Sequence, residues 1–202
     1  MRTHGDDVAQ VLALLGIKPV WQPESRRVQG LEVIPISELG HPRIDVTVRI
    51  SGFFRDAFPN LINLLDQAVE MAAAQDETIE ENYIVKHFQE DMARRGTASG
   101  EEQRSLSGTG VEGEGDRASS LYRIFGSKPG TYGAGILAAL DERNWETVED
   151  LAEVYTAWGG YAYTQKDFGV SARPQFRQRF SQIVVAAKNQ DTREHDIFDS
   201  DD

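Results

Sequence analysis

The closing segment of the chain holds the residues best suited to metal chemistry. His195 precedes Asp199, Asp201 and Asp202 there. An imidazole beside carboxylates suits borderline divalent cations such as Co²⁺, and both kinds of group can accept a proton. In a helix, His195, Asp199 and Asp202 would share one face. A solvated acidic tail or a helix cap would give the same spacing, so the pattern alone leaves both interpretations open.

A second segment, residues 51–60, combines three phenylalanines with an arginine directly after a stretch of alternating apolar residues. Ligands of open α/β sheets tend to bind where a strand ends. Phe53 and Phe54 could contact a flat apolar ring, and Arg55 could pair with a carboxylate on its edge. The alternative is an Arg55–Asp56 surface pair above ordinary core aromatics.

A third segment is glycine-rich and covers residues 126–135, between a predicted strand and a predicted helix. Its spacing matches neither a P-loop nor a dinucleotide-binding fingerprint. The backbone around Gly130 and Tyr132 could approach a large flat or anionic ligand, with Lys128 supplying positive charge. A tight turn that needs glycine for positive φ is the simpler interpretation.

The remaining histidines His4, His41 and His87 are isolated in the sequence. His87 falls on an apolar face of a predicted helix, which indicates a core histidine with a satisfied hydrogen bond rather than a ligand. The chain has no cysteine, so disulfides, zinc fingers, iron–sulfur ligation and thiol nucleophiles are excluded.

Charge and composition narrow the class of protein. The 202 residues include 33 acidic and 21 basic side chains, a formal net charge of −12, which argues against nucleic-acid binding. No stretch approaches the roughly 20 apolar residues that a membrane span requires. The polar N-terminal residues lack the apolar region of a secretory signal, and a cytoplasmic location is therefore expected.

The helices and strands predicted around these segments indicate an α/β fold, a mixed layered sheet with flanking helices. Residues 6–15 have helical periodicity and end at Gly16, and residues 44–50 alternate as a strand does. We expect three parts: residues 1–95 with strand 44–50 and helices 59–74 and 78–95, a flexible glycine-rich and acidic loop at 96–116, and a second α/β segment at 117–202.

Four strings of the sequence, in order, resemble the large-subunit family of aerobic cobaltochelatase, CobN, which is related to the H subunit of magnesium chelatase. They cover residues 43–60, 122–135, 154–163 and 188–202. The resemblance extends over nearly the whole chain outside residues 96–116. It implies that the chain is an internal piece from the C-terminal half of a larger multidomain subunit, and that this piece alone is inactive.

The resemblance also implies an activity, the ATP-dependent insertion of Co²⁺ into hydrogenobyrinic acid a,c-diamide during cobalamin biosynthesis. ATP and Mg²⁺ would be used by separate partners, an AAA+ ATPase subunit and a metal-binding-domain subunit, and not bound here. Insertion requires dehydration of the cation and loss of the macrocycle's N–H protons. The residues expected to serve are His195 and Asp199 as proton acceptors, these two with Asp201 as metal ligands, and Phe53, Phe54, Arg55, Lys128, Gly130 and Tyr132 against the macrocycle.

Two alternatives remain open. One is the equivalent fragment of a magnesium chelatase H subunit, which would insert Mg²⁺ into protoporphyrin IX. The other is a module without catalysis that binds a tetrapyrrole or docks a partner subunit.

Overall fold

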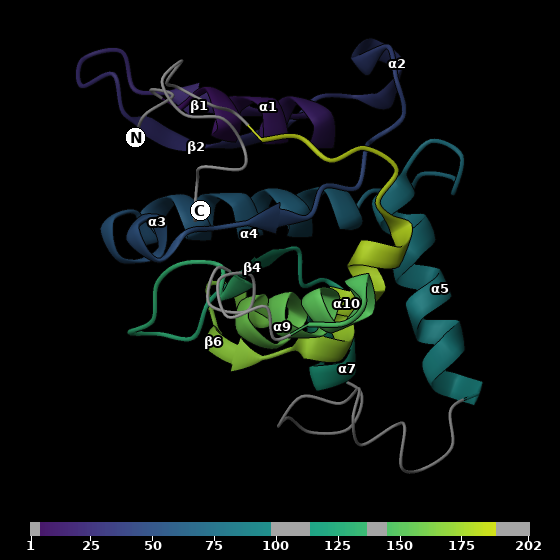
Figure 1. Ribbon diagram of the computed structural model, residues 1–202. Coiled ribbons are helices and arrows are strands. Elements are labelled where there is room, and N and C mark those ends of the chain that lie inside the picture. Colours follow the sequence, from purple (N-terminus) through teal and green to yellow (C-terminus); the bar gives the residue numbers. More distant parts are fainter. Residues whose placement is uncertain (1–4, 98–113, 137–144, 189–202) are drawn as a thin grey trace. The chain divides into compact units, whose positions relative to one another are not determined.

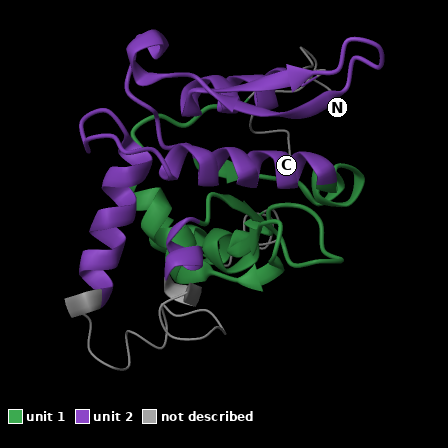
Figure 2. Cartoon of the chain, turned by 180° about the vertical axis from the view of Figure 1, so that it is seen from behind, with its two compact units in different colours: residues 1–4, 47–59, 122–202 green, residues 5–46, 60–121 purple. Residues whose placement is uncertain are grey.

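The computed structural model describes residues 5–97, 114–136 and 145–188 (Figure 1). The chain divides into two compact units, which Figure 2 colours separately. Unit 1 comprises residues 1–4, 47–59 and 122–202, and unit 2 comprises residues 5–46 and 60–121. Segments of the two units alternate along the chain. The composition had instead predicted consecutive parts, separated by a loop at residues 96–116.

Unit 2 is mainly helical and contains one antiparallel hairpin. Its elements are α1 (Asp6–Leu15), β1 (Ile17–Trp21), β2 (Val28–Val33), α2 (Ile36–Leu39), α4 (Pro59–Ala73, with Pro59 in unit 1), α5 (Tyr83–Thr97) and α7 (Glu114–Ser120). The apolar stripe of α1 packs in a core with α4 and α5, which comprises Leu12, Leu15, Ile17, Ala68, Val69, Ala72 and Ile84.

Unit 1 is built on a four-stranded mixed sheet in the order β3-β4-β5-β6, in which β3 and β4 are parallel and the other pairs antiparallel. Its elements are β3 (Val48–Arg49), α3 (Gly52–Ala57), β4 (Ile124–Gly126), α9 (Val148–Gly159), β5 (Tyr161–Tyr163), β6 (Phe168–Ser171) and α10 (Arg173–Gln182). An aromatic core centred on Phe125 and Phe176 joins the sheet to α9 and α10. The predicted α/β class with helices beside a mixed sheet is confirmed.

The predicted strand at residues 44–50 is much shorter, because its first amides bond elsewhere. The N–H of Arg43 donates to the carbonyl of Glu81 (2.8 Å), and that of Ile44 donates to the carbonyl of Leu14 (2.9 Å). Strand pairing begins only at Val48, whose N–H donates to the carbonyl of Arg123 (2.7 Å). Alternation therefore correctly indicated extended backbone, but only residues 48–49 pair with another strand.

The predicted helix at 59–74 is confirmed as α4, whereas the helix expected from residue 78 begins later. The side chain of Asn82 accepts hydrogen bonds from the amides of Ile84 (3.0 Å) and Val85 (3.1 Å), and α5 starts at Tyr83.

The predicted loop at 96–116 falls largely on residues 98–113, outside the described residues. Its two ends are helical, because α5 continues to Thr97 and α7 begins at Glu114. Across the described ranges, no helix is both long and apolar enough to cross a bilayer.

Candidate functional site

The phenylalanine segment forms α3, a short helix that follows β3. The hydroxyl of Ser51 caps it by accepting the N–H of Phe54 (3.1 Å). The ring of Phe53 is 66% exposed, and Phe54 is half-buried with its ring centroid 5.6 Å from that of Phe58. Of the two predicted ring contacts, Phe53 is thus free to meet a ligand, and Phe54 mainly packs within the protein.

Arg55 connects α3 to the glycine-rich loop, residues 126–135. Its side chain is 1% exposed. Nη1 donates to the carbonyls of Lys128 (3.0 Å) and Thr131 (3.0 Å), and Nε and Nη2 donate to the carboxylate of Asp56 (2.7 and 2.9 Å). The predicted pairing of Arg55 with a ligand carboxylate does not fit this burial. Arg55 instead fixes the loop against α3. The alternative Arg55–Asp56 pair is present, with a buried guanidinium and an exposed carboxylate.

The loop returns over the same helix through Tyr132. Its ring lies over the guanidinium of Arg55, 5.4 Å from ring centroid to Cζ, and its hydroxyl donates to Oδ2 of Asp56 (2.7 Å). A Cβ at Gly52 would lie 2.6 Å from Cδ1 of Tyr132 and 2.9 Å from the carbonyl oxygen of Thr131. Glycine at position 52 therefore permits the close approach of loop and helix.

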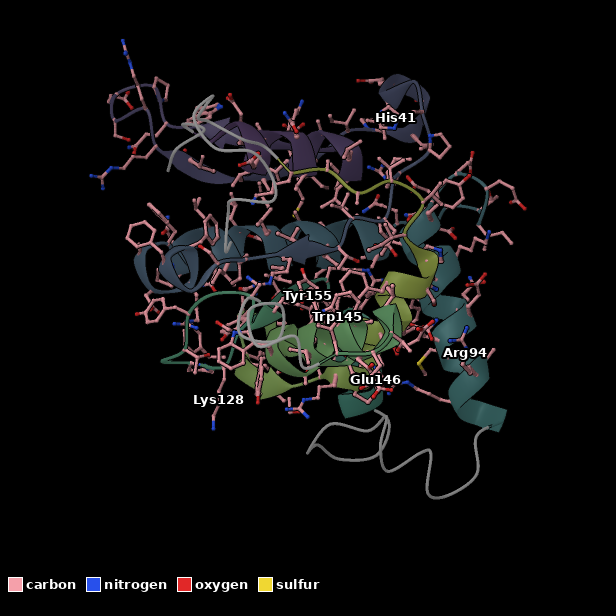
Figure 3. All side chains as sticks on the ribbon, viewed as in Figure 1. His41, Arg94, Lys128, Trp145, Glu146 and Tyr155 are labelled. Atoms are coloured by element: carbon pink, nitrogen blue, oxygen red, sulfur yellow. The ribbon has the colours of Figure 1, made fainter. Side chains whose placement is uncertain are left out.

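The tip of the loop is a turn closed by the hydrogen bond from the Thr131 amide to the Lys128 carbonyl (2.9 Å). Gly130 in this turn has φ +82°, which glycine adopts without strain. The interpretation as a tight turn is thus confirmed, and Lys128 is exposed on it (Figure 3). A ligand at this tip could reach the ammonium group of Lys128 and the backbone at Gly130, which has no side chain to block its approach.

Four exposed side chains share this corner of unit 1, namely Phe53, Asp56, Lys128 and Tyr132. We call them the α3–loop surface. It offers two aromatic rings, one carboxylate and one ammonium group. Such a combination suits a flat, largely apolar molecule with charged groups at its edge.

Sequence reasoning missed Phe168, which is 55% exposed on β6. Its ring stands edge-on to Tyr163 at 5.1 Å, and the hydroxyl of Tyr163 donates to the carbonyl of Ser127 in the loop. A Cβ at Gly169 would lie 2.3 Å from Cγ of Pro129. The isolated Gly169 after an aromatic residue was the one local sign that β6 packs closely against the loop.

The carboxyl group of Asp56 is expected to stay ionised far into the acid range. Its hydrogen bonds from Arg55, and to a smaller extent from Tyr132, lower its pKa from 3.8 to about 2. The same contact with Asp56 raises the pKa of Tyr132. Because the folded-state pKa is the lower one, the stabilisation from this cluster is complete above about pH 4 and is lost as the pH falls through about 2.

A titration followed by the carboxyl ¹³C shift of Asp56 measures this pKa. In Tyr132→Phe, which keeps the ring and removes one hydrogen bond, the pKa of Asp56 should rise toward 3.8. An unchanged midpoint in this variant would show that the Tyr132 hydroxyl does not bind Asp56.

The predicted metal and proton-transfer residues His195, Asp199 and Asp201 lie outside the described residues, and their roles stay predictions. Within residues 5–97, 114–136 and 145–188, no group of three or more histidine and acidic side chains could hold a metal ion. The described part of the chain thus contains the residues predicted to contact the ring, and among its residues no group of three or more potential ligands is gathered for a metal ion.

Comparison with known proteins gives consistent matches over the chain. Residues 1–202 match the family model described as CobN/Magnesium Chelatase. The aerobic cobaltochelatase subunit CobN of Pseudomonas aeruginosa is 50% identical over the whole chain, which spans 15% of that relative's length. The magnesium-chelatase subunit ChlH of Oryza sativa subsp. indica is 33% identical over 98% of the chain, which spans 13% of that protein.

A solved structure, the catalytic subunit of cobaltochelatase from Mycobacterium tuberculosis, is similar with a TM-score of 0.83 and 51% identity. The match covers 96% of this chain and 15% of the solved chain. The chain therefore corresponds to a small part of a much longer kind of protein.

Proposed function

Because the chain belongs to the CobN/magnesium chelatase family, we propose that it is part of a cobaltochelatase large subunit that inserts Co²⁺ into hydrogenobyrinic acid a,c-diamide for cobalamin biosynthesis. The preference for cobalt over magnesium rests on 50% identity to a CobN subunit against 33% to a ChlH subunit. A magnesium chelatase fragment acting on protoporphyrin IX is the second candidate.

The observation that carries the proposal is the α3–loop surface. Phe53 and Tyr132 are 66% and 60% exposed. Tyr132 is held by the guanidinium of Arg55 and the carboxylate of Asp56, and the ring of Phe53 stands edge-on to that of Phe58. A corrinoid or porphyrin macrocycle presents a flat apolar face for the two rings and peripheral carboxylates for Lys128. Asp56 repels those carboxylates, which favours one orientation of the macrocycle edge.

Metal insertion has two chemical requirements. One is a group that helps replace the water ligands of Co²⁺ with ring nitrogens, and the other is a base that accepts the macrocycle's N–H protons. His195, Asp199 and Asp201 remain our proposed ligands and acceptors, because imidazole and carboxylates suit both tasks. ATP hydrolysis is assigned to an AAA+ partner subunit, acting with a subunit that carries a metal-binding domain. The net charge of −12 would let such partners dock through basic surfaces.

Replacing Phe53 with alanine in the complete polypeptide is expected to weaken binding of hydrogenobyrinic acid a,c-diamide about tenfold. Loss of one ring contact removes roughly 1–1.5 kcal/mol, and 1.4 kcal/mol corresponds to a factor of ten. Absorbance titration of the macrocycle measures the dissociation constant. The matched control is Trp21→Ala, which removes an exposed aromatic ring (57%) from β1 of unit 2 and should change the constant less than twofold.

The same titration separates the candidate functions. Tighter binding of protoporphyrin IX than of the diamide would favour the magnesium chelatase, and no binding of either macrocycle would favour a docking module. An F53A variant that binds the diamide as well as the wild type does would remove the α3–loop surface from the proposal.

A further inference from the structure

Asp56 gives the α3–loop surface a hydrogen-bond acceptor that is held in a fixed direction. Its Oδ2 accepts from Nη2 of Arg55 (2.9 Å) and from the hydroxyl of Tyr132 (2.7 Å), which fills both lone-pair positions of that oxygen. Its Oδ1 accepts from Nε of Arg55 (2.7 Å) and, among the residues that the structure describes, from no second donor. The Asp56 side chain is 43% exposed. One acceptor position, on Oδ1, is therefore left for a ligand.

The Asp56 carboxylate keeps this acceptor role at neutral pH. Its pKa is lowered to about 2, mainly by the hydrogen bonds from Arg55, so the group is ionised and only accepts hydrogen bonds. The guanidinium of Arg55 carries the opposite charge, but it is 1% exposed, and its donors face Asp56 and the glycine-rich loop. A ligand group that reaches Oδ1 thus meets a lone pair rather than an N–H of Arg55.

Lys128 supplies the complementary group of the same surface. Its backbone carbonyl accepts from Nη1 of the guanidinium that binds Asp56 through Nε and Nη2, so one rigid planar group links the two residues. Its side chain is exposed, and an ammonium group only donates hydrogen bonds. A carboxylate of a ligand therefore suits Lys128, and a carboxamide N–H suits Asp56. A carboxylate at Asp56 would bring lone pairs and negative charges together.

We propose that Asp56 is a specificity-determining residue, which accepts a hydrogen bond from a carboxamide at the macrocycle's edge and so selects the amidated macrocycle over its carboxylate counterpart. This inference rests on the proposed function, in which the substrate carries two carboxamides as well as carboxylates. An analogue with carboxylates in both amide positions lacks the N–H donor and places an anion against Oδ1. A site that hydrogen-bonds a substrate N–H discriminates against such an analogue.

The test is an absorbance titration of two macrocycles with the complete polypeptide at neutral pH. The first is hydrogenobyrinic acid a,c-diamide, and the second is hydrogenobyrinic acid, the same macrocycle with carboxylates in place of both amides. We expect the wild type to bind the diamide about tenfold more tightly than the acid. This ratio is far below the discrimination of a fully buried site, because water reaches Asp56.

In Asp56→Asn the preference for the diamide should disappear. With its oxygen in the place of Oδ2, the asparagine keeps the hydrogen bonds from Nη2 of Arg55 and from Tyr132, and its amide turns an N–H toward the ligand. Hydrogenobyrinic acid should then bind about threefold or more tightly than to the wild type, and the diamide less tightly. The gain for the acid is the decisive result, because damage to the α3–loop surface would weaken binding of both macrocycles.

The matched control is Glu146→Gln, which removes an exposed carboxylate of unit 1 just before α9 (Figure 3). The glycine-rich loop is held at the other end of α9, where Nε1 of Trp158 donates to the carbonyl of Gly133 (2.8 Å). Because a helix rises about 1.5 Å per residue, Val148 and Trp158 are about 15 Å apart, which exceeds the Debye length at physiological ionic strength. Both dissociation constants should stay within twofold of the wild type.

Equal binding of the two macrocycles by the wild type would overturn the role of Asp56 and leave the proposed function intact. A D56N variant that weakens binding of both macrocycles in proportion would do the same. A change of the ratio in E146Q as large as that in D56N would also overturn the role, since the preference would then follow the net charge. Failure of the wild type to bind the diamide would overturn the proposed function together with this inference.

Discussion

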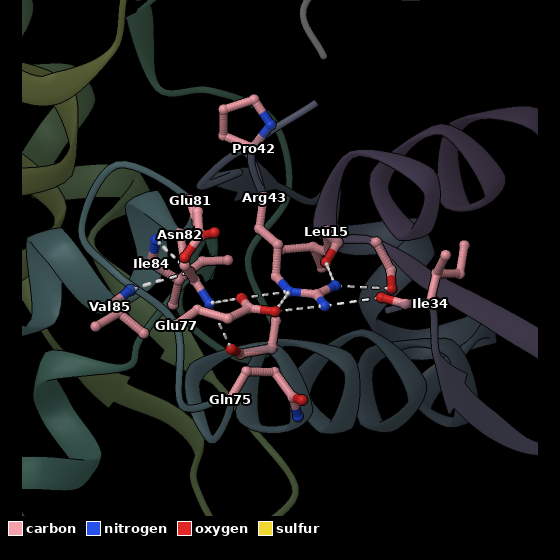
Figure 4. Close-up of polar contacts among 12 residues, drawn as sticks. Leu15, Ile34, Pro42, Arg43, Gln75, Glu77, Glu81, Asn82, Ile84 and Val85 are labelled. Carbon is pink, nitrogen blue, oxygen red and sulfur yellow. Dashed lines mark hydrogen bonds and ion pairs between the residues drawn. The ribbon is translucent and has the colours of Figure 1, made fainter. Parts of the chain in front are cut away.

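Replacing Arg43 with methionine is expected to destabilise unit 2 by about 3–5 kcal/mol, the range seen when one partner of a buried ion pair is removed. The Arg43 side chain is 0% exposed and that of Glu77 is 9% exposed. Nε donates to Glu77 (2.8 Å), Nη1 to the carbonyls of Leu15 (3.1 Å) and Gly16 (2.9 Å), and Nη2 to that of Ile34 (2.8 Å) (Figure 4).

Methionine fills a similar volume but donates no hydrogen bond. It leaves the Glu77 carboxylate with the side-chain amide of Asn82 (2.9 Å) as its remaining donor among the described residues, in a site that water hardly reaches. The three carbonyls belong to the end of α1 and to the segment after β2. Arg43 thus joins a helix end, the hairpin and the segment before α5, and its removal loosens all three.

Amide hydrogen exchange in the complete polypeptide measures this effect, as a loss of protection in α1 and β2. The matched control is Lys18→Met, because the Lys18–Glu32 pair (3.3 Å) is 52% and 59% exposed and contributes about 0.5 kcal/mol or less. Equal, small effects in the two variants would contradict a structural role for Arg43.

The helices that the sequence predicted well carry local signals. Gly16 ends α1 with its amide bonded to the carbonyls of Leu12 and Ala13, and Thr147 with Asp150 forms the predicted capping box of α9. Such signals act within a few residues and need no knowledge of the rest of the fold.

The alternating stretch at 44–50 predicted too long a strand. Alternation indicates which face of an extended segment is buried, but not which part of the chain its backbone hydrogen-bonds to. The amide of Ile44 bonds to Leu14, a residue far earlier in the chain. Nothing in the residues 44–47 themselves distinguishes that contact from a strand ladder.

For the candidate site, the residue roles taken from the sequence stay predictions, and the structure shows which of these side chains are exposed and which are buried. Phe53, Tyr132 and Lys128 are exposed as a ligand surface requires. Arg55 was expected at that surface as the partner of a ligand carboxylate. Its burial depends on the carbonyls of residues 127–131 closing around it, a long-range arrangement that no local pattern encodes.

Arg55→Met is therefore expected to release the glycine-rich loop from α3 and to weaken macrocycle binding more than F53A does. Methionine cannot donate the hydrogen bonds that Nη1 of Arg55 gives to the carbonyl oxygens of Ser127, Lys128 and Thr131. Each carbonyl keeps another donor, namely the hydroxyl of Tyr163 for Ser127, the amide of Thr131 for Lys128 and the hydroxyl of Ser127 for Thr131. We therefore expect the loop to lose about 2–3 kcal/mol of local stability, the range for hydrogen bonds from a charged group.

Two measurements check the Arg55→Met variant. Amide exchange across residues 126–135 should accelerate, and the dissociation constant for hydrogenobyrinic acid a,c-diamide should rise more than tenfold. In addition, the pKa of Asp56 should rise from about 2 toward 3.8, because Arg55 is the main cause of its low value. The matched control, Arg27→Met, alters an exposed arginine of unit 2 and should change none of the three. If the loop loosens while binding is unchanged, the macrocycle does not contact the α3–loop surface, since a surface held in place by Arg55 cannot bind equally well after its support is removed.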